Sequence, residues 1–259
     1  MRIVIKIGTS TLAHPTGHLN IRLVEELCKV VSDIKNAGHQ VILVSSGAIG
    51  MGVGKLGLRE RPRDIPGKQA AAAVGQCELM YIYDKLFGEF NHTVGQLLIT
   101  AEDIGCGKRR ENFSNTLGRL LELNAIPIIN ENDTVAVDEI VIGDNDNLAA
   151  NVANCVDADL LILLTDIDGV YTADPHKDPD AKLIPKIDRV TEEIYALAGG
   201  AGTKQGTGGM RTKLEAAANC LAHGINMVIA NGNRPENLYD ILDGKNVGTY
   251  FTARKCKHD

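Results

Sequence analysis

The 259-residue sequence lacks the cysteine and histidine patterns that mark a disulfide framework or a zinc site. Its six cysteines are scattered without a C-x-x-C pair, and its seven histidines include no H-E-x-x-H. In a chain of this length, such spacing is typical of reduced thiols in a cytosolic protein. We therefore expect a cytoplasmic protein with no disulfides and no structural or catalytic zinc.

Long apolar runs and an excess of positive charge are also absent. No stretch approaches the roughly 18 uninterrupted apolar residues of a membrane span, and no apolar signal segment opens the chain. The formal net charge of −6 argues against a general nucleic-acid binder, because such proteins need a basic surface. We predict no membrane or nucleic-acid partner, although local lysines and backbone amides could still bind an anionic substrate.

Three nucleotide- and metal-binding motifs are missing or misplaced. No Gly-Lys pair is followed by Ser or Thr, which excludes a P-loop. A G-x-G-x-x-G pattern at 52–57 lies well past the preceding strand and runs into Pro62, so we reject it as a NAD site. The alternating Asp and Asn residues of 144–147 lack the Gly and Glu that an EF-hand loop requires, which excludes calcium.

Segments typical of strands and of helices alternate almost from end to end. The expected strands are 3–7, 41–44, 94–99, 126–129, 160–164, 227–229 and 247–251. The expected helices lie between Asn20 and Gly38 and near 68–90, 113–124, 146–156, 191–198, 210–223 and 235–242. Continuous apolar strands alternating with helices predict a mainly parallel sheet covered by helices on both faces, in one continuous α/β unit.

Polar and glycine-rich segments follow four of these strands, at 6–10, 45–52, 130–133 and 165–169. In parallel sheets, ligands bind beyond the carboxyl ends of the strands, so these segments are candidates for a site. Glycines such as Gly8 and Gly47 allow the backbone to approach an anion closely. They are equally typical of ordinary strand-to-helix turns, and both interpretations stay open.

Two lysines occupy positions that suggest an anionic ligand. Lys6 lies near the end of the first strand. If its ammonium group is buried there, it needs a partner, because burying an unpaired charge is costly. Alternatively, the side chain reaches the surface and stays solvated. Lys213 falls in the first turn of a helix that follows glycines 208 and 209, and such a helix start offers N–H groups to a phosphate. For Lys213, the alternative is a solvated lysine beside a surface loop.

The polar run 143–147 could cap a helix, hold an ammonium group or orient lysines.

Taken together, these segments show that the sequence resembles the amino acid kinase family over essentially its whole length. The motifs that carry the resemblance are KIGTS (6–10), VSSGAIGMG (44–52), INENDTVA (129–136), GDNDNLAA (143–150), LLTDIDGVYTADP (163–175) and GTGGMRTKLEAA (206–217). The resemblance implies a three-layer αβα sandwich that forms a single domain, 1–259, without the C-terminal PUA domain of many bacterial members. Residues 1–150 would form a glutamate-binding lobe and about 151–255 an ATP-binding lobe. The implied reaction is Mg²⁺- and ATP-dependent phosphorylation of the glutamate side-chain carboxylate, the first step of proline biosynthesis.

The resemblance also implies roles for individual residues. Lys6 and Lys213 would stabilise the migrating phosphoryl group, and Asp146 would hold the two lysines. The residues implied for glutamate binding are Ser46, Gly47, Asp133 and Asn145. Those implied for ATP binding are Lys6, Gly8, Thr165, Asp166, Thr207, Gly208, Gly209, Met210, Arg211, Thr212 and Lys213, with Gly8 and Gly47 supplying backbone donors. No side chain is expected to bind a metal.

The partners that the resemblance implies are a second copy of the chain, in a dimer or tetramer, and a glutamyl phosphate reductase that uses the product. Segment 101–116 corresponds roughly to the family's inhibitor-sensing loop, so inhibition by proline is open. Two alternatives to the main interpretation also stay open. One is a related kinase acting on another small carboxylate, such as acetylglutamate. The other is a catalytically silent regulator that binds nucleotide or amino acid, although the presence of both Lys6 and Lys213 argues against it.

Overall fold

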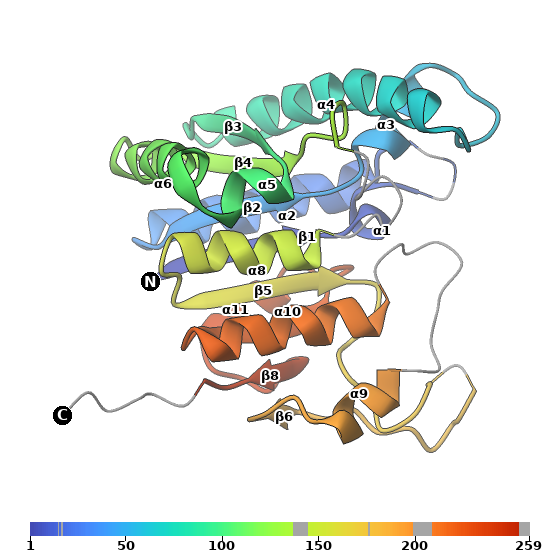
Figure 1. Cartoon of the computed structure of the whole chain (residues 1–259), viewed down its shortest axis with the longest axis vertical. Helices are drawn as coiled ribbons and strands as arrows, with labels where there is room; N and C mark the ends of the chain where they lie inside the picture. Colours follow the sequence, from blue (N-terminus) through green and yellow to red (C-terminus); the bar gives the residue numbers. More distant parts are fainter. Residues whose placement is uncertain (15, 17, 137–144, 176, 199–208, 254–259) are drawn as a thin grey trace.

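The computed structural model describes residues 1–259 except 15, 17, 137–144, 176, 199–208 and 254–259. Strands and helices alternate along the chain to form one sheet between two layers of helices (Figure 1). The strands are β1 (Arg2–Ile7), β2 (Gln40–Ser45), β3 (Val94–Ile99), β4 (Ile126–Glu131), β5 (Leu160–Thr165), β6 (Lys186–Ile187), β7 (Asn226–Asn231) and β8 (Thr249–Phe251). The helices are α1 (Thr9–Leu12), α2 (Ile21–Asn36), α3 (Ala48–Lys55), α4 (Ile65–Gly88), α5 (Ala101–Gly105), α6 (Gly107–Glu122), α8 (Asp146–Cys155), α9 (Glu192–Ala198), α10 (Met210–Ala222) and α11 (Asn237–Leu242).

The sheet is mainly parallel, which confirms the expected fold class. Its strand order is β3-β4-β2-β1-β5-β7-β8-β6. Among the pairs of strands that the structure describes, only β7 with β8 is antiparallel, a common arrangement near the edge of a large parallel sheet. The first strand of the chain, β1, lies at the centre of the sheet, between β2 and β5.

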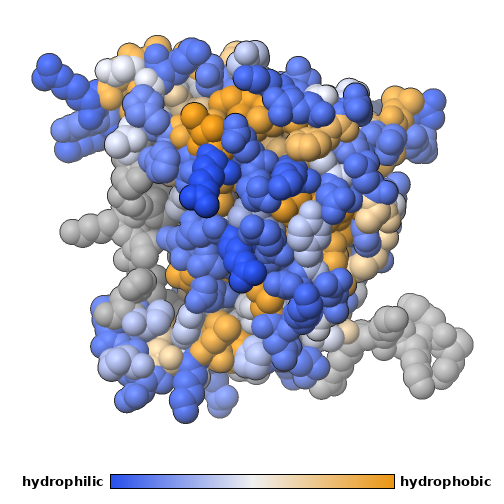
Figure 2. Space-filling model, turned by 180° about the vertical axis from the view of Figure 1, so that it is seen from behind, coloured by the Kyte–Doolittle hydropathy of each residue, from blue (hydrophilic) through white to orange (hydrophobic). Residues whose placement is uncertain are grey.

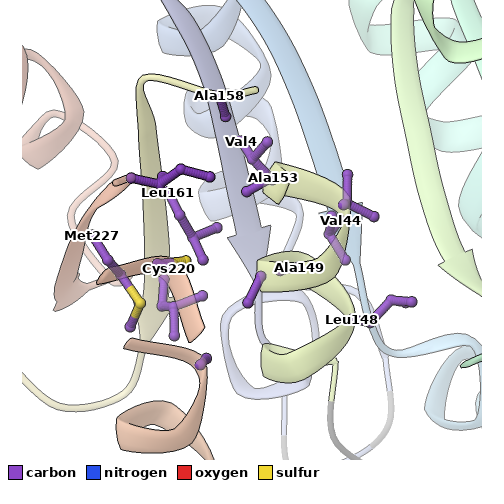
Figure 3. Close-up of a cluster of buried hydrophobic side chains, with 14 of the residues drawn as sticks. Val4, Val44, Leu148, Ala149, Ala153, Ala158, Leu161, Cys220 and Met227 are labelled. Carbon is purple, nitrogen blue, oxygen red and sulfur yellow. The ribbon is translucent and has the colours of Figure 1, made fainter. Parts of the chain in front are cut away.

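Two apolar clusters fill the space between the sheet and its helices. Val4 and Val44 pack with Ala149 of α8 and with residues of α6 and α10 on one face, as Figure 3 shows in part. On the other face, Ile3 and Ile5 pack with residues of α2, α4 and α11. Small side chains on α8, such as Ala149 and Ala153, allow this helix to lie close to the sheet.

The alternation of side chains along β1 decides where Lys6 points. Successive residues of a strand face opposite sides of the sheet, so Lys6 shares the face of Val4 and is directed toward α8. The lysine is 8% exposed. It is therefore held inside the protein and does not reach the surface along the strand end.

Helix α3 was not expected from the sequence, because its glycines favour a loop. A Cβ atom built at Gly52 would lie 1.8 Å from the carbonyl oxygen of Ala71 in α4, and one at Gly75 would lie 1.8 Å from that of Ala48 in α3. The two helices thus approach so closely that only glycine fits at these contacts. Within the G-x-G-x-x-G pattern at 52–57, Gly52 thus allows α3 to pack against α4.

Other boundaries also differ from the sequence expectation. Helix α4 begins at Ile65 instead of 68, where the side chain of Asp64 accepts a hydrogen bond from the N–H of Gly67 at 2.8 Å. Helix α6 begins at Gly107 instead of 113, and α1, α5 and β6 were not expected. Short elements and helix starts without an apolar period carry a weak signal, which explains these differences.

The outer surfaces of the helices are largely hydrophilic. Figure 2 shows the side opposite to α8 and α10, which is mostly hydrophilic, with hydrophobic residues gathered mainly in its upper half. Within the described ranges, no helix combines the length and the apolar character that crossing a membrane would require.

Candidate active site

The candidate site lies at the edge of the sheet where parallel strands β1, β2, β4 and β5 end. Because these strands run in the same direction, the polar segments that follow them meet at one edge. Helices α8 and α10 also begin at this edge (Figure 1).

Two ammonium groups contact a single buried carboxylate here. The Nζ of Lys6 lies 2.8 Å from Oδ1 of Asp146, and the Nζ of Lys213 lies 2.9 Å from Oδ2. Asp146 has no exposed surface, and Lys213 is 6% exposed. We call these three residues the Lys–Asp–Lys cluster.

The cluster joins three elements that are far apart in the sequence. Lys6 comes from the end of β1, Asp146 is the first residue of α8, and Lys213 lies in the first turn of α10. The carboxylate is favourably placed at the start of α8, where the helix dipole is positive. Lys213 is unfavourably placed with respect to the dipole of α10, and its contact with Asp146 offsets that cost.

The electrostatics of the cluster favour an anionic ligand. Burial raises the pKa of Asp146, but the charges and hydrogen bonds of Lys6 and Lys213 outweigh this effect and hold its pKa well below the ordinary value. The carboxylate is therefore ionised at neutral pH. Two ammonium groups and one carboxylate leave a formal charge of +1, in a buried place where charge acts strongly.

A second group of polar side chains adjoins the cluster. The Nδ2 of Asn145, the residue before Asp146, donates to the carbonyl oxygen of Ser45 at 2.7 Å and contacts Oγ of Ser46 at 3.1 Å. The structure thus brings Ser46 and Asn145 together. Gly47 follows with φ +94°, a left-handed conformation that glycine adopts without strain, and it begins α3.

Asp133 lies in the turn after β4 and is partly buried. It lines a small cavity that is also lined by Ala48 and Gln76. Burial raises the pKa of Asp133 to about 6, although the positive charge of Arg61 acts in the opposite direction. The carboxylate is accordingly still mostly ionised at pH 7 and can attract a cation.

A larger cavity lies on the other side of the cluster. Among the residues assigned to ATP from the sequence, it is lined by Thr165, Asp166, Gly209, Met210 and Lys213. Since Lys213 also contacts Asp146, this cavity opens onto the Lys–Asp–Lys cluster. Lining residues that the sequence analysis did not assign are Ile167, Gly169, Val170, Tyr171, Ala173, Asp174, Pro175 and Leu197. All of these except Leu197 lie in 167–175, shortly after β5. Gly169 and Pro175 in this segment are the sequence signal that could have identified them.

Among the residues assigned to ATP that the structure describes, four do not line this cavity: Lys6, Gly8, Arg211 and Thr212. Arg211 pairs with Glu215 at 3.0 Å on the exposed side of α10. Thr212 bonds Oδ2 of Asp146 at 3.2 Å through its hydroxyl, so it contacts the cluster. Thr207 and Gly208 lie outside the described residues.

Gly8 differs from the expectation in its hydrogen bonding. Its N–H donates to the carbonyl oxygen of Leu164 at 3.3 Å, so this donor is already used by the sheet edge. A Cβ atom at this position would lie 3.9 Å from Nζ of Lys6. Gly8 therefore borders the cluster through its small size. In the part of the chain that the structure describes, no group of three or more His, Cys, Asp or Glu side chains could hold a metal ion.

Comparison with known proteins identifies relatives of the whole chain. The model of the amino acid kinase family matches residues 1–231. The chain is 52% identical to glutamate 5-kinase of Clostridium perfringens over 258 residues, covering 98% of this chain and 96% of the relative. It is 54% identical to glutamate 5-kinase of Listeria innocua, covering 98% and 94%.

Solved structures with the same fold include two other kinases. Carbamate kinase from Giardia lamblia, bound to AMP-PNP, has a TM-score of 0.68 at 19% identity and covers 98% of each chain. UMP kinase from Bacillus anthracis has a TM-score of 0.65 at 18% identity and covers 97% of this chain and 95% of its own. At such low identity, these likenesses establish the fold alone.

Proposed function

The chain belongs to the amino acid kinase family, and we propose that it transfers the γ-phosphate of ATP to the side-chain carboxylate of L-glutamate. The product is L-glutamyl 5-phosphate, and the reaction is the first step of proline biosynthesis. The full-length identity of 52–54% to glutamate 5-kinases supports this substrate. The observation that carries the proposal is the convergence of Lys6 and Lys213 on Asp146, beside the larger cavity that Lys213 also lines.

The reaction does not require a general base. The glutamate side chain has an ordinary pKa of about 4.3, so it is already an ionised nucleophile at neutral pH. The obstacle is the approach of one anion to another. Catalysis then depends on positioning the two substrates in line and on positive charge around the migrating phosphoryl group.

In this proposal the Lys–Asp–Lys cluster supplies that charge. The ammonium groups of Lys6 and Lys213 stabilise the phosphoryl group as negative charge spreads over its oxygens. Asp146 holds both lysines in place through contacts of 2.8 and 2.9 Å. Since the cluster is formally positive before any ligand enters, little reorganisation is needed when the phosphates bind.

The amino acid occupies the side of the site formed by Ser46, Asn145 and Asp133. The ionised carboxylate of Asp133 pairs with the α-ammonium group of glutamate. This pairing disfavours acetylglutamate, whose α-nitrogen is an uncharged amide and would leave the carboxylate of Asp133 without a cation. All three residues belong to 1–150, which supports the assignment of this part of the chain as the glutamate-binding lobe.

ATP occupies the larger cavity as its Mg²⁺ complex, with the metal carried on its phosphates. The lining residues extend from Thr165 to Lys213, which supports the assignment of about 151–255 as the ATP-binding lobe. Their apolar members, such as Val170, Leu197 and Met210, suit the flat apolar faces of a nucleobase. Lys213 lies where the cavity meets the cluster, as the γ-phosphate requires.

The test is a panel of carboxylates offered with MgATP and hydroxylamine. Acyl phosphates react with hydroxylamine to give hydroxamates, so glutamate should give hydroxamate and one equivalent of ADP. Aspartate and acetylglutamate should give far less. Turnover of acetylglutamate above that of glutamate would identify a different member of the family, and nucleotide binding without ADP release in any arm would identify a silent regulator.

We further propose a cytoplasmic homo-oligomer whose product passes to a glutamyl phosphate reductase. The scattered cysteines support the compartment. Exposed apolar side chains at Leu56, Leu58 and Ile65 support self-association. The lability of an acyl phosphate in water supports rapid use by a reductase. Sedimentation analysis, and product trapping with the reductase present, test these two points.

A further inference from the structure

Three buried amide side chains form a hydrogen-bonded chain beneath the proposed glutamate site. Asn145 donates through Nδ2 to Oδ1 of Asn130 at 3.0 Å, and Asn130 donates through Nδ2 to Oε1 of Gln76 at 2.8 Å. Asn130 is 2% exposed, and the other two are 8% exposed. This hydrogen-bonded chain of amides, which we call the amide chain, connects α4 with the start of α8 across the end of β4.

The direction of this chain is fixed by backbone groups that have only one hydrogen-bonding role. Asn145 must turn its Nδ2 toward Ser45, because it contacts a carbonyl oxygen there at 2.7 Å. Asn130 must turn its Oδ1 the same way, because this atom also accepts from the backbone N–H of Glu131 at 2.9 Å. The Nδ2 of Asn130 then needs an acceptor, and Gln76 supplies it.

Glutamine is a costly choice here if its role is only to fill space. The Nε2 of Gln76 is buried and has no hydrogen-bond partner among the described residues. A buried donor without a partner destabilises the fold, and an apolar side chain of similar shape would avoid that cost. The hydrogen bond that Gln76 does make uses its Oε1, which accepts from Nδ2 of Asn130.

This hydrogen bond affects the ligand through Asn145. The two hydrogens of its Nδ2 are shared among three acceptors, on Ser45, Ser46 and Asn130, which leaves Oδ1 as the atom that it offers to a ligand. We propose that Gln76 is a positioning residue for the amino-acid substrate: by accepting from Nδ2 of Asn130, it stabilises the orientation that the backbone groups select, in which Asn145 turns its acceptor toward the α-ammonium group. This inference rests on the proposed function and adds Gln76 to the residues assigned to substrate binding from the sequence, as one that acts through Asn130 and Asn145.

The test compares Gln76→Met with Gln76→Glu. Methionine keeps the shape but removes the acceptor, so the KM for glutamate should rise about tenfold, the scale of one lost hydrogen bond, with kcat nearly unchanged. The KM for ATP should stay constant. The Gln76→Glu variant still presents an oxygen to Asn130 and should restore most of the affinity. The thermal midpoint of the methionine variant should stay close to that of the wild type, because one unpaired buried donor, Nδ2 of Asn130, replaces another, Nε2 of Gln76.

Tyr83→Phe is the matched control. Tyr83 lies seven residues later on the same face of α4, and its hydroxyl contacts Oγ of Ser45 at 3.0 Å. If loosening α4 were enough to weaken substrate binding, this variant would raise the KM for glutamate as much as Gln76→Met. We expect a much smaller effect, because Tyr83 takes no part in the amide chain.

Three results would overturn the inference: an unchanged KM for glutamate in Gln76→Met, equal rises in both KM values, or a Gln76→Glu variant as defective as Gln76→Met. If the Gln76→Met protein does not fold, the Gln76→Glu protein alone decides. The inference then requires that its KM for glutamate is close to that of the wild type. Hydrogen exchange of the Asn145 side-chain amide, measured by NMR, should accelerate in the methionine variant. This measurement does not depend on turnover, so it separates failure of the inference from failure of the proposed function, which would appear as an inactive wild type.

Discussion

Replacing Asp146 by asparagine tests the central arrangement of the site. The carboxylate contacts two ammonium groups at 2.8 and 2.9 Å and has no exposed surface. At an effective dielectric constant of about 20, each contact corresponds to an attraction of about 6 kcal/mol before the cost of desolvation. The Asp146→Asn substitution would remove both attractions and leave two buried lysines with a formal charge of +2.

The free energy of unfolding should therefore fall by about 3–5 kcal/mol, the usual cost of removing one member of a buried ion pair. For a chain of this length, that corresponds to a decrease in Tm of about 6–20 °C. Calorimetry or urea unfolding would measure the change. MgATP should also raise the Tm of the variant more than that of the wild type, because its phosphates replace the missing negative charge.

The matched control is Asp240→Asn. Asp240 pairs with Lys245 at 2.7 Å, a similar distance, but this lysine side chain is 60% exposed. Surface pairs contribute little to stability, so the control should lose far less than the Asp146 variant. Equal losses in the two variants, or an Asp146→Asn protein as stable as the wild type, would refute the reasoning from burial and charge.

Three other positions test separate parts of the same structure. Lys213→Met should lower kcat by roughly 10²-fold or more, the scale of losing one preorganised donor. Arg211→Met, on the exposed side of the same helix turn, should leave kcat nearly unchanged. Near-normal turnover of the Lys213→Met variant would exclude a role of Lys213 in stabilising the phosphoryl group. Because the pKa of Asp133 is raised to about 6, the KM for glutamate should increase as the pH falls below that value. Asp133→Asn should remove this pH dependence and raise KM at pH 8. It should also increase stability at that pH, since folding disfavours the ionised form; unaltered pH dependence in the variant would assign the titration elsewhere. Gly75→Ala should destabilise the protein strongly, because its Cβ would lie 1.8 Å from a carbonyl oxygen of α3. Gly88→Ala, with nothing within 4 Å in the same helix, should be neutral or stabilising by about 0.5–1 kcal/mol, as urea unfolding would show.

The sequence predicts the layers of the fold well, because continuous apolar strands and periodic helices leave few other arrangements. It fails at α3, where the low helix propensity of glycine is outweighed by close packing against α4. Helix propensity is a local property, whereas the contact with Ala71 is tertiary. No window of sequence around 48–55 contains that information.

The site is predicted in part for a similar reason. Strand ends indicate where Lys6 and Thr165 lie, but the sequence could not decide whether Lys6 is buried, since its partner Asp146 is 140 positions away. The amide chain through Gln76 is invisible for the same reason: a glutamine within an alanine-rich helix shows no local feature that indicates a partner on β4.

The central place of β1 has a consequence for how the protein is made. This strand is synthesised long before one of its two neighbours, β5, which ends only at Thr165. During translation, one edge of an apolar strand must therefore stay without its neighbour until the residues up to Thr165 have left the ribosome. Such long-range parallel pairing slows folding and leaves an edge open to other chains. We expect newly made chains to depend on chaperones during that interval, and fusions or changes near the N-terminus to lower the yield of folded protein more than changes near β8.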